Sequence, residues 1–281
     1  MNLDKFYTKS DVAERCYNFL IEKLGDLSKY IFLEPSAGDG KFLPYLNNYE
    51  AYDILPEEEN ITQQDFLTWE PNRFDYITIG NPPFGKRSKL AIEFFNKCAV
   101  CSNVVAFVLP VSFMKYGVQK QLDSNFKLID YFLLDENSFT AEGKDFSIRC
   151  VFQIWVKKDS EFDRFENLRK KAPSPITHND FQIWQYNATP ESLSVIDEDW
   201  EIAFYRQGYH DYNSYFTSAE RESIREKMTG QKKQQFFFVK PSSEEIKQKI
   251  LSMDMNLLAA RNTTTPGFGK ADFVEFYNEQ D

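Results

Sequence analysis

An apolar run that stops at two prolines constrains the fold of this chain more than any other feature. Residues 74–80 (FDYITIG) alternate and are rich in aromatic and β-branched side chains, which predicts a buried strand. Pro82 and Pro83 follow, and they donate no backbone N–H. Pro82 also holds Asn81 in an extended conformation. The chain must therefore leave the sheet in a rigid loop, which fixes the amide of Asn81 at the carboxyl end of a strand, where open α/β sheets bind ligands.

The side chains of this loop suit the activation of an amino group that is conjugated to a ring. The side-chain oxygen of Asn81 and the carbonyl oxygen of Pro82 can each accept one N–H. Phe84 can stack on the ring, and such stacking is worth roughly 1–3 kcal/mol for a nucleic-acid base. A tight proline turn capped by Asn81 is the alternative interpretation, because Asn and Pro are both common in turns.

A second strand end carries glycines. The apolar residues 30–33 predict a short strand, which is followed by Glu34, a loop with Gly38 and Gly40, and the start of a helix. Glycine permits close approach of the backbone to a ligand, and a helix N-terminus favours polar ligand groups. This pattern predicts a nucleotide-binding turn.

Acidic residues follow the next two strands. Asp53 ends the strand expected near residues 49–52, at the distance from the glycines where doubly wound folds place an acid on a ribose diol. Asp53 could instead cap the turn at Leu55. Asp65 and Phe66 follow a third short strand, and we expect them to receive an adenine amino group and to cover its ring.

Further strands are expected at residues 103–109, 126–133 and 150–156. The connection 134–149 is long and polar, so we expect it to lie over a site and not to form a tight hairpin. Together these elements predict a Rossmann-like, doubly wound α/β fold with a smaller α+β region after it.

The composition changes after the last of these strands. Residues 159–171 are densely charged, and Pro173 and Pro175 follow them, as in a linker. We therefore expect a first domain at 1–158, a linker at 159–174 and a C-terminal region at 175–281.

The net charge of −10 argues against broad electrostatic adhesion to nucleic acid. A local basic strip after the proline loop, formed by Lys86, Arg87 and Lys89, is nevertheless suited to phosphate contacts. We expect no metal site, because the chain has two histidines and a single CxxC pair, Cys98 and Cys101, beside an apolar stretch. These thiols are expected to be buried and reduced.

No apolar run approaches the length of a membrane span, and residues 1–5 are not typical of a signal peptide. We therefore expect a soluble, cytoplasmic protein that has no membrane partner. The sequence makes no prediction of the oligomeric state.

Taken in order, five segments resemble the S-adenosylmethionine-dependent DNA adenine N6-methyltransferases. The segments are Phe6 to Thr8, Glu34 to Gly40, Asp53, Asp65 with Phe66, and Asn81 to Phe84. Their order is similar to that of the gamma group of this family, and the resemblance covers roughly residues 1–158. It implies a methyltransferase sheet, S-adenosylmethionine as cofactor, DNA as partner, a flipped target adenine, an association with restriction-modification, and target recognition by residues 175–281.

The resemblance also implies roles for individual residues. Phe6, Tyr7 and Thr8 would line the methionine end of the cofactor, Glu34, Gly38 and Gly40 its amino-acid and sulfonium portion, Asp53 its ribose, and Asp65 and Phe66 its adenine. Pro35, Ser36, Asp39, Ile54 and Asn81 would also contact the cofactor. Asn81, Pro82, Pro83 and Phe84 would hold the target, and Lys86, Arg87 and Lys89 would contact nucleic acid.

Other functions are compatible with the same loop. Asn-Pro-Pro followed by an aromatic residue serves several conjugated amines, so an RNA adenine or a protein glutamine amide are alternative substrates. A catalytically silent domain that binds nucleic acid or a partner chain is the alternative from a different class, although the intact Asn81, Gly38 and Gly40 argue against it.

Overall fold

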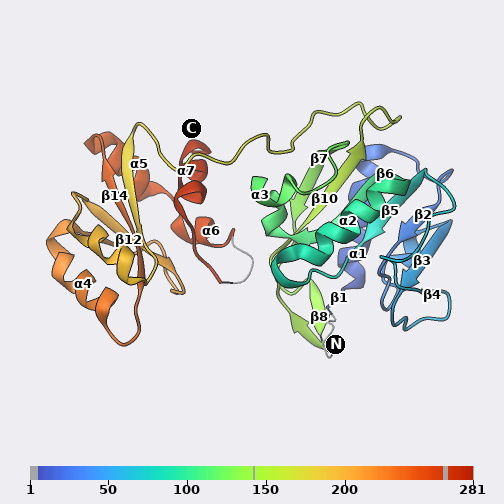
Figure 1. Ribbon diagram of the computed structural model, residues 1–281, viewed down its shortest axis with the longest axis horizontal. Coiled ribbons are helices and arrows are strands. Elements are labelled where there is room, and N and C mark those ends of the chain that lie inside the picture. The colour runs from blue at the N-terminus through green and yellow to red at the C-terminus, as the bar shows by residue number, and fades with distance from the viewer. Residues whose placement is uncertain (1–5, 142, 262–264, 281) are drawn as a thin grey trace. The chain divides into compact units, whose positions relative to one another are not determined.

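The computed structural model describes residues 6–141, 143–261 and 265–280, and the chain forms two compact units, Met1–Lys171 and Ala172–Asp281 (Figure 1). The expectation about a signal peptide in residues 1–5 lies outside the described residues. Within these ranges no helix combines the length and the hydropathy needed to cross a bilayer.

A seven-stranded sheet forms the centre of the first unit. Its strands are β2 (Phe32–Glu34), β3 (Tyr49–Asp53), β4 (Thr62–Gln63), β5 (Tyr76–Gly80), β6 (Ser102–Pro110), β7 (Phe126–Leu133) and β10 (Cys150–Lys157). They lie in the order β4-β3-β2-β5-β6-β10-β7, and β10 runs antiparallel to both of its neighbours. The strand order reverses between β2 and β5, as in doubly wound nucleotide-binding folds. The predicted Rossmann-like α/β class is confirmed.

Helices cover both faces of this sheet (Figure 1). Helix α1 (Ser10–Leu24) packs Cys16 and Leu20 against one face, and α2 (Lys89–Cys101) packs Phe95 and Cys98 against the other. Strand β6 supplies alternate residues to the two cores, for example Val104 to the first and Val105 to the second. All four cysteines of the chain are free and buried, which agrees with the expectation for Cys98 and Cys101.

A smaller three-stranded sheet joins the N-terminal segment to the polar connection 134–149. Strand β1 (Tyr7–Thr8) pairs with β8 (Phe139–Ala141), which pairs with β9 (Lys144–Phe146). The expectation that this connection avoids a tight hairpin is wrong, because Ala141 pairs directly with Lys144. The hairpin is stabilised by its long-range pairing with β1 and by stacking of Phe6 on Phe146, at 4.5 Å between ring centroids.

Short helical segments connect the remaining parts of the first unit. They are η1 (Leu43–Tyr45), η2 (Lys86–Ser88), η3 (Val111–Met114) and α3 (Tyr116–Gln119). The first two follow the glycine loop and the proline loop, respectively. The side chains of Ser88 and Ser112 are hydrogen-bonded at 3.0 Å, which ties η2 to η3.

The first unit extends to Lys171, whereas a boundary at 158 was expected. Phe162 in the charged run is buried, and the backbone of Leu168 bonds to Leu128 on strand β7. The guanidinium of Arg169 donates to the carbonyl oxygens of Gln119, Leu122, Asp123 and Phe126 at 2.6–3.0 Å. Most of the expected linker is therefore part of the first unit, because its arginine donates to backbone carbonyl groups at the end of α3 and in the turn after it.

The second unit is a four-stranded antiparallel sheet with helices, as expected for a smaller α+β region. Its strands β11 (Phe181–Tyr186), β14 (Gln235–Pro241), β12 (Ile202–Gln207) and β13 (Tyr215–Thr217) lie in that order. The helical segments are η4 (Pro190–Asp197), η5 (Ser218–Glu220), α4 (Arg221–Thr229), α5 (Glu244–Ser252), α6 (Met255–Ala259) and α7 (Lys270–Asn278). Phe236, Phe237 and Phe238 are buried in its aromatic core.

We predict that Arg169→Ala lowers the free energy of unfolding of the first unit by about 2–4 kcal/mol, because it leaves several carbonyl groups without their charged donor. Lys158→Ala is the matched control. Lys158 is exposed and donates to a single carbonyl, that of Ser124, so its loss should cost less than about 1 kcal/mol. Urea unfolding followed by circular dichroism measures both, and equal effects of the two substitutions would contradict this role of Arg169.

Candidate active site

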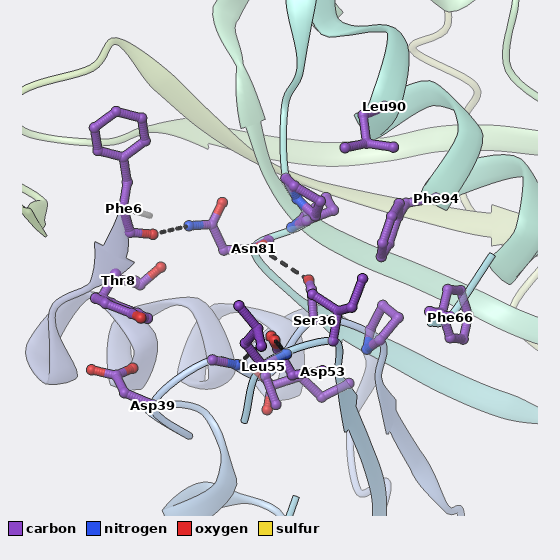
Figure 2. Close-up of a pocket in the computed structure, with 18 of the residues that line it drawn as sticks. Phe6, Thr8, Ser36, Asp39, Asp53, Leu55, Phe66, Asn81, Leu90 and Phe94 are labelled. Carbon is purple, nitrogen blue, oxygen red and sulfur yellow. Dashed lines mark hydrogen bonds between the residues drawn. The ribbon is translucent and has the colours of Figure 1, made fainter. Parts of the chain in front are cut away.

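A cavity of about 350 Å³ opens at the carboxyl ends of β2 and β5, where the strand order reverses (Figure 2). Its volume falls in the range typical of small-molecule sites. The loops after these two strands are joined by a hydrogen bond of 3.2 Å from the Ser36 hydroxyl to the Asn81 carbonyl oxygen. The glycine loop and the proline loop, far apart in the sequence, therefore form one site.

The glycine loop is held from two sides. The backbone N–H of Gly38 donates to Asp53 Oδ2 at 2.8 Å, so the acid at the end of β3 fixes the turn after β2. On the other side, the ring of Tyr7 packs on Gly38, where an added Cβ would lie 2.9 Å from Tyr7 Cε1 and where φ is +54°. Only glycine fits this position without a shift of the ring. The Tyr7 hydroxyl also donates to Glu57, in the segment after β3.

The carboxylate of Asp53 has two structural partners. Besides Gly38, it accepts the backbone N–H of Leu55 at 2.8 Å through Oδ1. The turn-capping interpretation of Asp53 is therefore correct. It does not exclude a ligand, because a carboxylate has about four acceptor sites and these two bonds leave capacity for hydroxyl groups.

Glu34 is a deeply buried acid of the site. Its side chain is 2% exposed, and among the described residues Oε2 has no hydrogen-bond partner. Gly80 permits this placement, because a Cβ there would lie 3.3 Å from Glu34 Cγ. Burial raises the pKa of the Glu34 carboxyl well above its usual range, and the nearby Asp39 and Asp53 raise it further. Such a group favours a cationic ligand, which would stabilise its charged form.

Asn81 presents an acceptor to the same cavity. Its Nδ2 donates to the carbonyl oxygen of Phe6 at 3.5 Å, which leaves Oδ1 buried and without a partner among the described residues (Figure 2). A buried unpaired oxygen costs free energy unless a ligand supplies the missing donor. The amide is therefore positioned to accept a hydrogen bond from a bound molecule.

An apolar wall closes the opposite end of the cavity. Phe66 is 2% exposed, and its ring packs between Trp69 and Phe94 at centroid distances of 5.3 and 5.5 Å. Asp65 accepts the backbone N–H of Leu67 at 3.0 Å, which orders the turn in front of this wall. A carboxylate beside an apolar surface suits a flat heterocycle that has an exocyclic amine.

The structure brings almost all predicted cofactor and target residues to this cavity. Those that line it are Phe6, Tyr7, Thr8, Glu34, Pro35, Ser36, Gly38, Asp39, Asp53, Ile54, Asp65, Phe66, Asn81, Pro82, Pro83 and Phe84. Gly40 is set back from the cavity, and its φ of +71° shapes the turn.

Eight further lining residues were not predicted as site residues, namely Ala37, Lys41, Phe42, Leu55, Gln64, Leu67, Leu90 and Phe94. Several of them adjoin motif residues, so proximity in sequence could have suggested them. Leu90 and Phe94 could have been found from the apolar face of helix α2 that follows the proline loop.

The predicted basic strip lies beside the cavity on η2 and the first residue of α2. Lys86, Arg87 and Lys89 are exposed, and Lys89 forms an i,i+4 ion pair with Glu93 at 3.6 Å. Arg87 and Ser88 have left-handed φ values of 57° and 62°, which is costly for residues with a side chain. The strip thus begins five residues after Asn81, on a backbone turn with two left-handed residues.

No family model matches the chain. A type II methyltransferase, M.CvrRI, of Paramecium bursaria Chlorella virus XZ-6E is 29% identical over 39% of this chain and 36% of its own length. The modification methylase CviBIII of Paramecium bursaria Chlorella virus NC1A is 24% identical over 48% of this chain and 45% of its own length.

The resemblance to the DNA methyltransferases is confirmed. The chain spans less than half the length of either relative. Among solved structures, the methyltransferase subunit of a type I restriction-modification system from Streptococcus thermophilus is 18% identical, with a TM-score of 0.40 over 57% of this chain and 46% of that one.

S-adenosylmethionine, the cofactor predicted from the sequence, follows from this relationship, and the cavity fits it. The buried Glu34 lacks a partner at Oε2, which suits the cofactor's cationic amino-acid end. Asp53 retains acceptor capacity for ribose hydroxyls, and Asp65 lies beside an apolar wall. When bound, the cofactor supplies an electrophilic methyl group on a sulfonium centre.

We predict that Glu34→Gln weakens S-adenosylmethionine binding at least about tenfold in calorimetry, because it removes a charged acceptor. The same substitution should flatten the pH dependence of stability without ligand. The raised pKa means that the folded parent retains a proton that the unfolded chain releases, so the parent loses stability as pH rises above the unfolded carboxyl pKa of about 4.5.

Unfolding by urea at several pH values, with Glu14→Gln as a control at an exposed carboxyl, measures this difference. An unchanged pH slope in Glu34→Gln would show that Glu34 is already ionised in the folded protein.

Proposed function

We propose that the protein transfers a methyl group from S-adenosylmethionine to the exocyclic N6 amine of adenine in DNA, with the target base turned out of the helix. The observation that carries this proposal is the buried, unpaired Asn81 Oδ1, held at the switch point of the sheet beside Glu34 and Asp53. An acceptor in this place has no structural partner among the described residues. It suits the N–H of a substrate amine.

The proposed chemistry follows from the weakness of the nucleophile. The lone pair of an adenine amine is delocalised into the ring, so the flat amine must become pyramidal to attack a methyl group. Asn81 Oδ1 and the adjacent Pro82 carbonyl oxygen would each accept one N–H of the amine. These two hydrogen bonds would be better with the pyramidal nitrogen of the transition state than with the flat nitrogen of the ground state. Stronger binding of the transition state than of the ground state is what accelerates a reaction.

The residues around Asn81 would position the base. Phe84 lines the cavity and is only partly buried, so part of its ring is available for stacking. Phe6 contacts Asn81 through its carbonyl oxygen and stacks on Phe146 of the β8–β9 hairpin. Phe84 would hold a base next to the amide, and stacking of this kind is worth roughly 1–3 kcal/mol per base.

The remaining assignments keep the order of the sequence motifs. We assign Phe6, Tyr7, Thr8, Glu34, Pro35, Ser36, Gly38 and Asp39 to the methionine end of the cofactor, Asp53 and Ile54 to its ribose, and Asp65 and Phe66 to its adenine. DNA is favoured over RNA or protein because both viral relatives are named as type II or modification methyltransferases. Residues 175–281 would contribute to target recognition.

Nucleoside analysis after methylation tests the proposal. The purified protein is incubated with labelled S-adenosylmethionine and, in separate reactions, with unmethylated genomic DNA, total RNA or a protein extract. Digestion and mass spectrometry should identify N6-methyladenine in the DNA. Label in RNA, in protein or on cytosine would show that the substrate is different from the proposed one. Binding of the cofactor without methyl transfer to any fraction would favour a catalytically silent domain.

We predict that Asn81→Ala reduces single-turnover methylation by about 10²–10³-fold, by analogy with the loss of one oxyanion-hole donor. Cofactor affinity should change little, because the glycine loop is untouched. Asn60→Ala, at an exposed amide that donates to the Tyr49 hydroxyl, is the control and should keep the parent rate. A near-parent rate for Asn81→Ala would remove its side chain from the mechanism.

We predict that replacing Lys86, Arg87 and Lys89 by alanine reduces the salt dependence of duplex binding. Each neutralised phosphate contributes about 0.9 to the slope of log K against log salt. Lys89 should contribute least, because Glu93 already pairs with it. Binding titrations at several salt concentrations measure the slope, and an unchanged slope would mean that the strip does not contact phosphates.

A further inference from the structure

Lys41 is the single cationic side chain among the described residues that line the cavity. Four acidic residues, Glu34, Asp39, Asp53 and Asp65, line it as well. This imbalance suits the positive sulfonium and ammonium groups of S-adenosylmethionine. It leaves the cofactor's third charged group, the carboxylate of its methionine portion, with few possible partners.

The surroundings of Lys41 are particularly acidic. Its Nζ lies 3.1 Å from Asp39 Oδ2, and the charge of Glu57 acts on the same Asp39 carboxyl. Burial raises the pKa of Asp39, whereas Lys41 acts in the opposite direction. The Lys41 side chain is 39% exposed, so its charge is not fully committed to Asp39. If the lysine were absent, a ligand carboxylate at this end of the cavity would face the negative charges of Asp39 and Glu57.

A second donor lies near the same loop. Thr8 Oγ1 is buried and has no hydrogen-bond partner within the described part of the chain. Strand β1, which carries it, lies against the glycine loop through the contact of Tyr7 with Gly38. Figure 2 shows Thr8 and Asp39 on the same side of the cavity. An ammonium and a hydroxyl group at this end form a suitable pair of donors for a carboxylate.

We propose that Lys41, together with Thr8, binds the carboxylate of the methionine portion and so makes the site selective for a methyl donor that carries this group. The inference rests on the proposed use of S-adenosylmethionine. The two charged groups of the cofactor's methionine portion are then bound by different residues. Glu34 faces the ammonium group, and Lys41 faces the carboxylate. Lys41 is then a binding residue and not only the counter-ion of Asp39.

Decarboxylated S-adenosylmethionine separates these two roles, because it lacks only the carboxylate. Calorimetry is carried out with both ligands on the parent, Lys41→Met and Lys41→Arg, and on Lys29→Met as a control at an exposed ion pair outside the cavity. The parent should prefer S-adenosylmethionine. Lys41→Met should lose about tenfold in affinity for it and little for the decarboxylated ligand, whereas Lys41→Arg and Lys29→Met should keep the preference.

The outcomes distinguish this inference from the proposed function. Equal losses for both ligands in Lys41→Met would mean that the lysine only neutralises Asp39, and no loss for either would mean that it faces solvent. Both results overturn the inference and leave the methyltransferase proposal standing. A folded parent that binds neither ligand would instead overturn the proposed function, and this inference with it.

Discussion

The hydrogen bond from the Ser36 hydroxyl to the Asn81 carbonyl joins the two loops on which the site depends. One loop follows β2 and the other follows β5, and the strand order reverses between these two strands. Crossover connections leave a reversal point in opposite directions, which opens a crevice there. The loop after β2 is held by Asp53 and Tyr7, and the loop after β5 is stiffened by its prolines. The bond between them therefore sets the spacing of the proposed cofactor and target sites.

The structure maintains this crevice at a cost in stability. Among the described residues, five buried side-chain atoms lack hydrogen-bond partners, and those of Thr8, Glu34 and Asn81 all belong to the cavity. Each unpaired group costs about 1–3 kcal/mol, and a strained backbone at Arg87 and Ser88 adds to this. The packed sheet and its two helices supply the stability that makes such a site possible, and a ligand that pairs these atoms recovers part of the cost.

Most of the sheet and of the candidate site could be predicted from the sequence. The strand β7 at 126–133 was located correctly, because a run of apolar and β-branched residues is a local signal. The hairpin β8–β9 was missed, because it depends on pairing with β1, more than a hundred residues earlier. The charged run 159–171 was misjudged for a similar reason, since the partners of Arg169 are backbone carbonyls that composition does not reveal.

The net negative charge of the protein is compatible with its proposed DNA substrate, because the acids and the exposed basic strip lie in different places. Acids inside the cavity, such as Glu34 and Asp53, favour a cationic cofactor, whereas phosphates would meet the exposed Lys86 and Arg87 outside it. At physiological salt the Debye length is about 8 Å, so exposed acids farther away than this are largely screened from a phosphate at the strip. A net charge of −10 therefore weakens long-range attraction to DNA more than it weakens contacts at the strip. The proposed affinity for DNA would therefore depend on a few local cations after the proline loop.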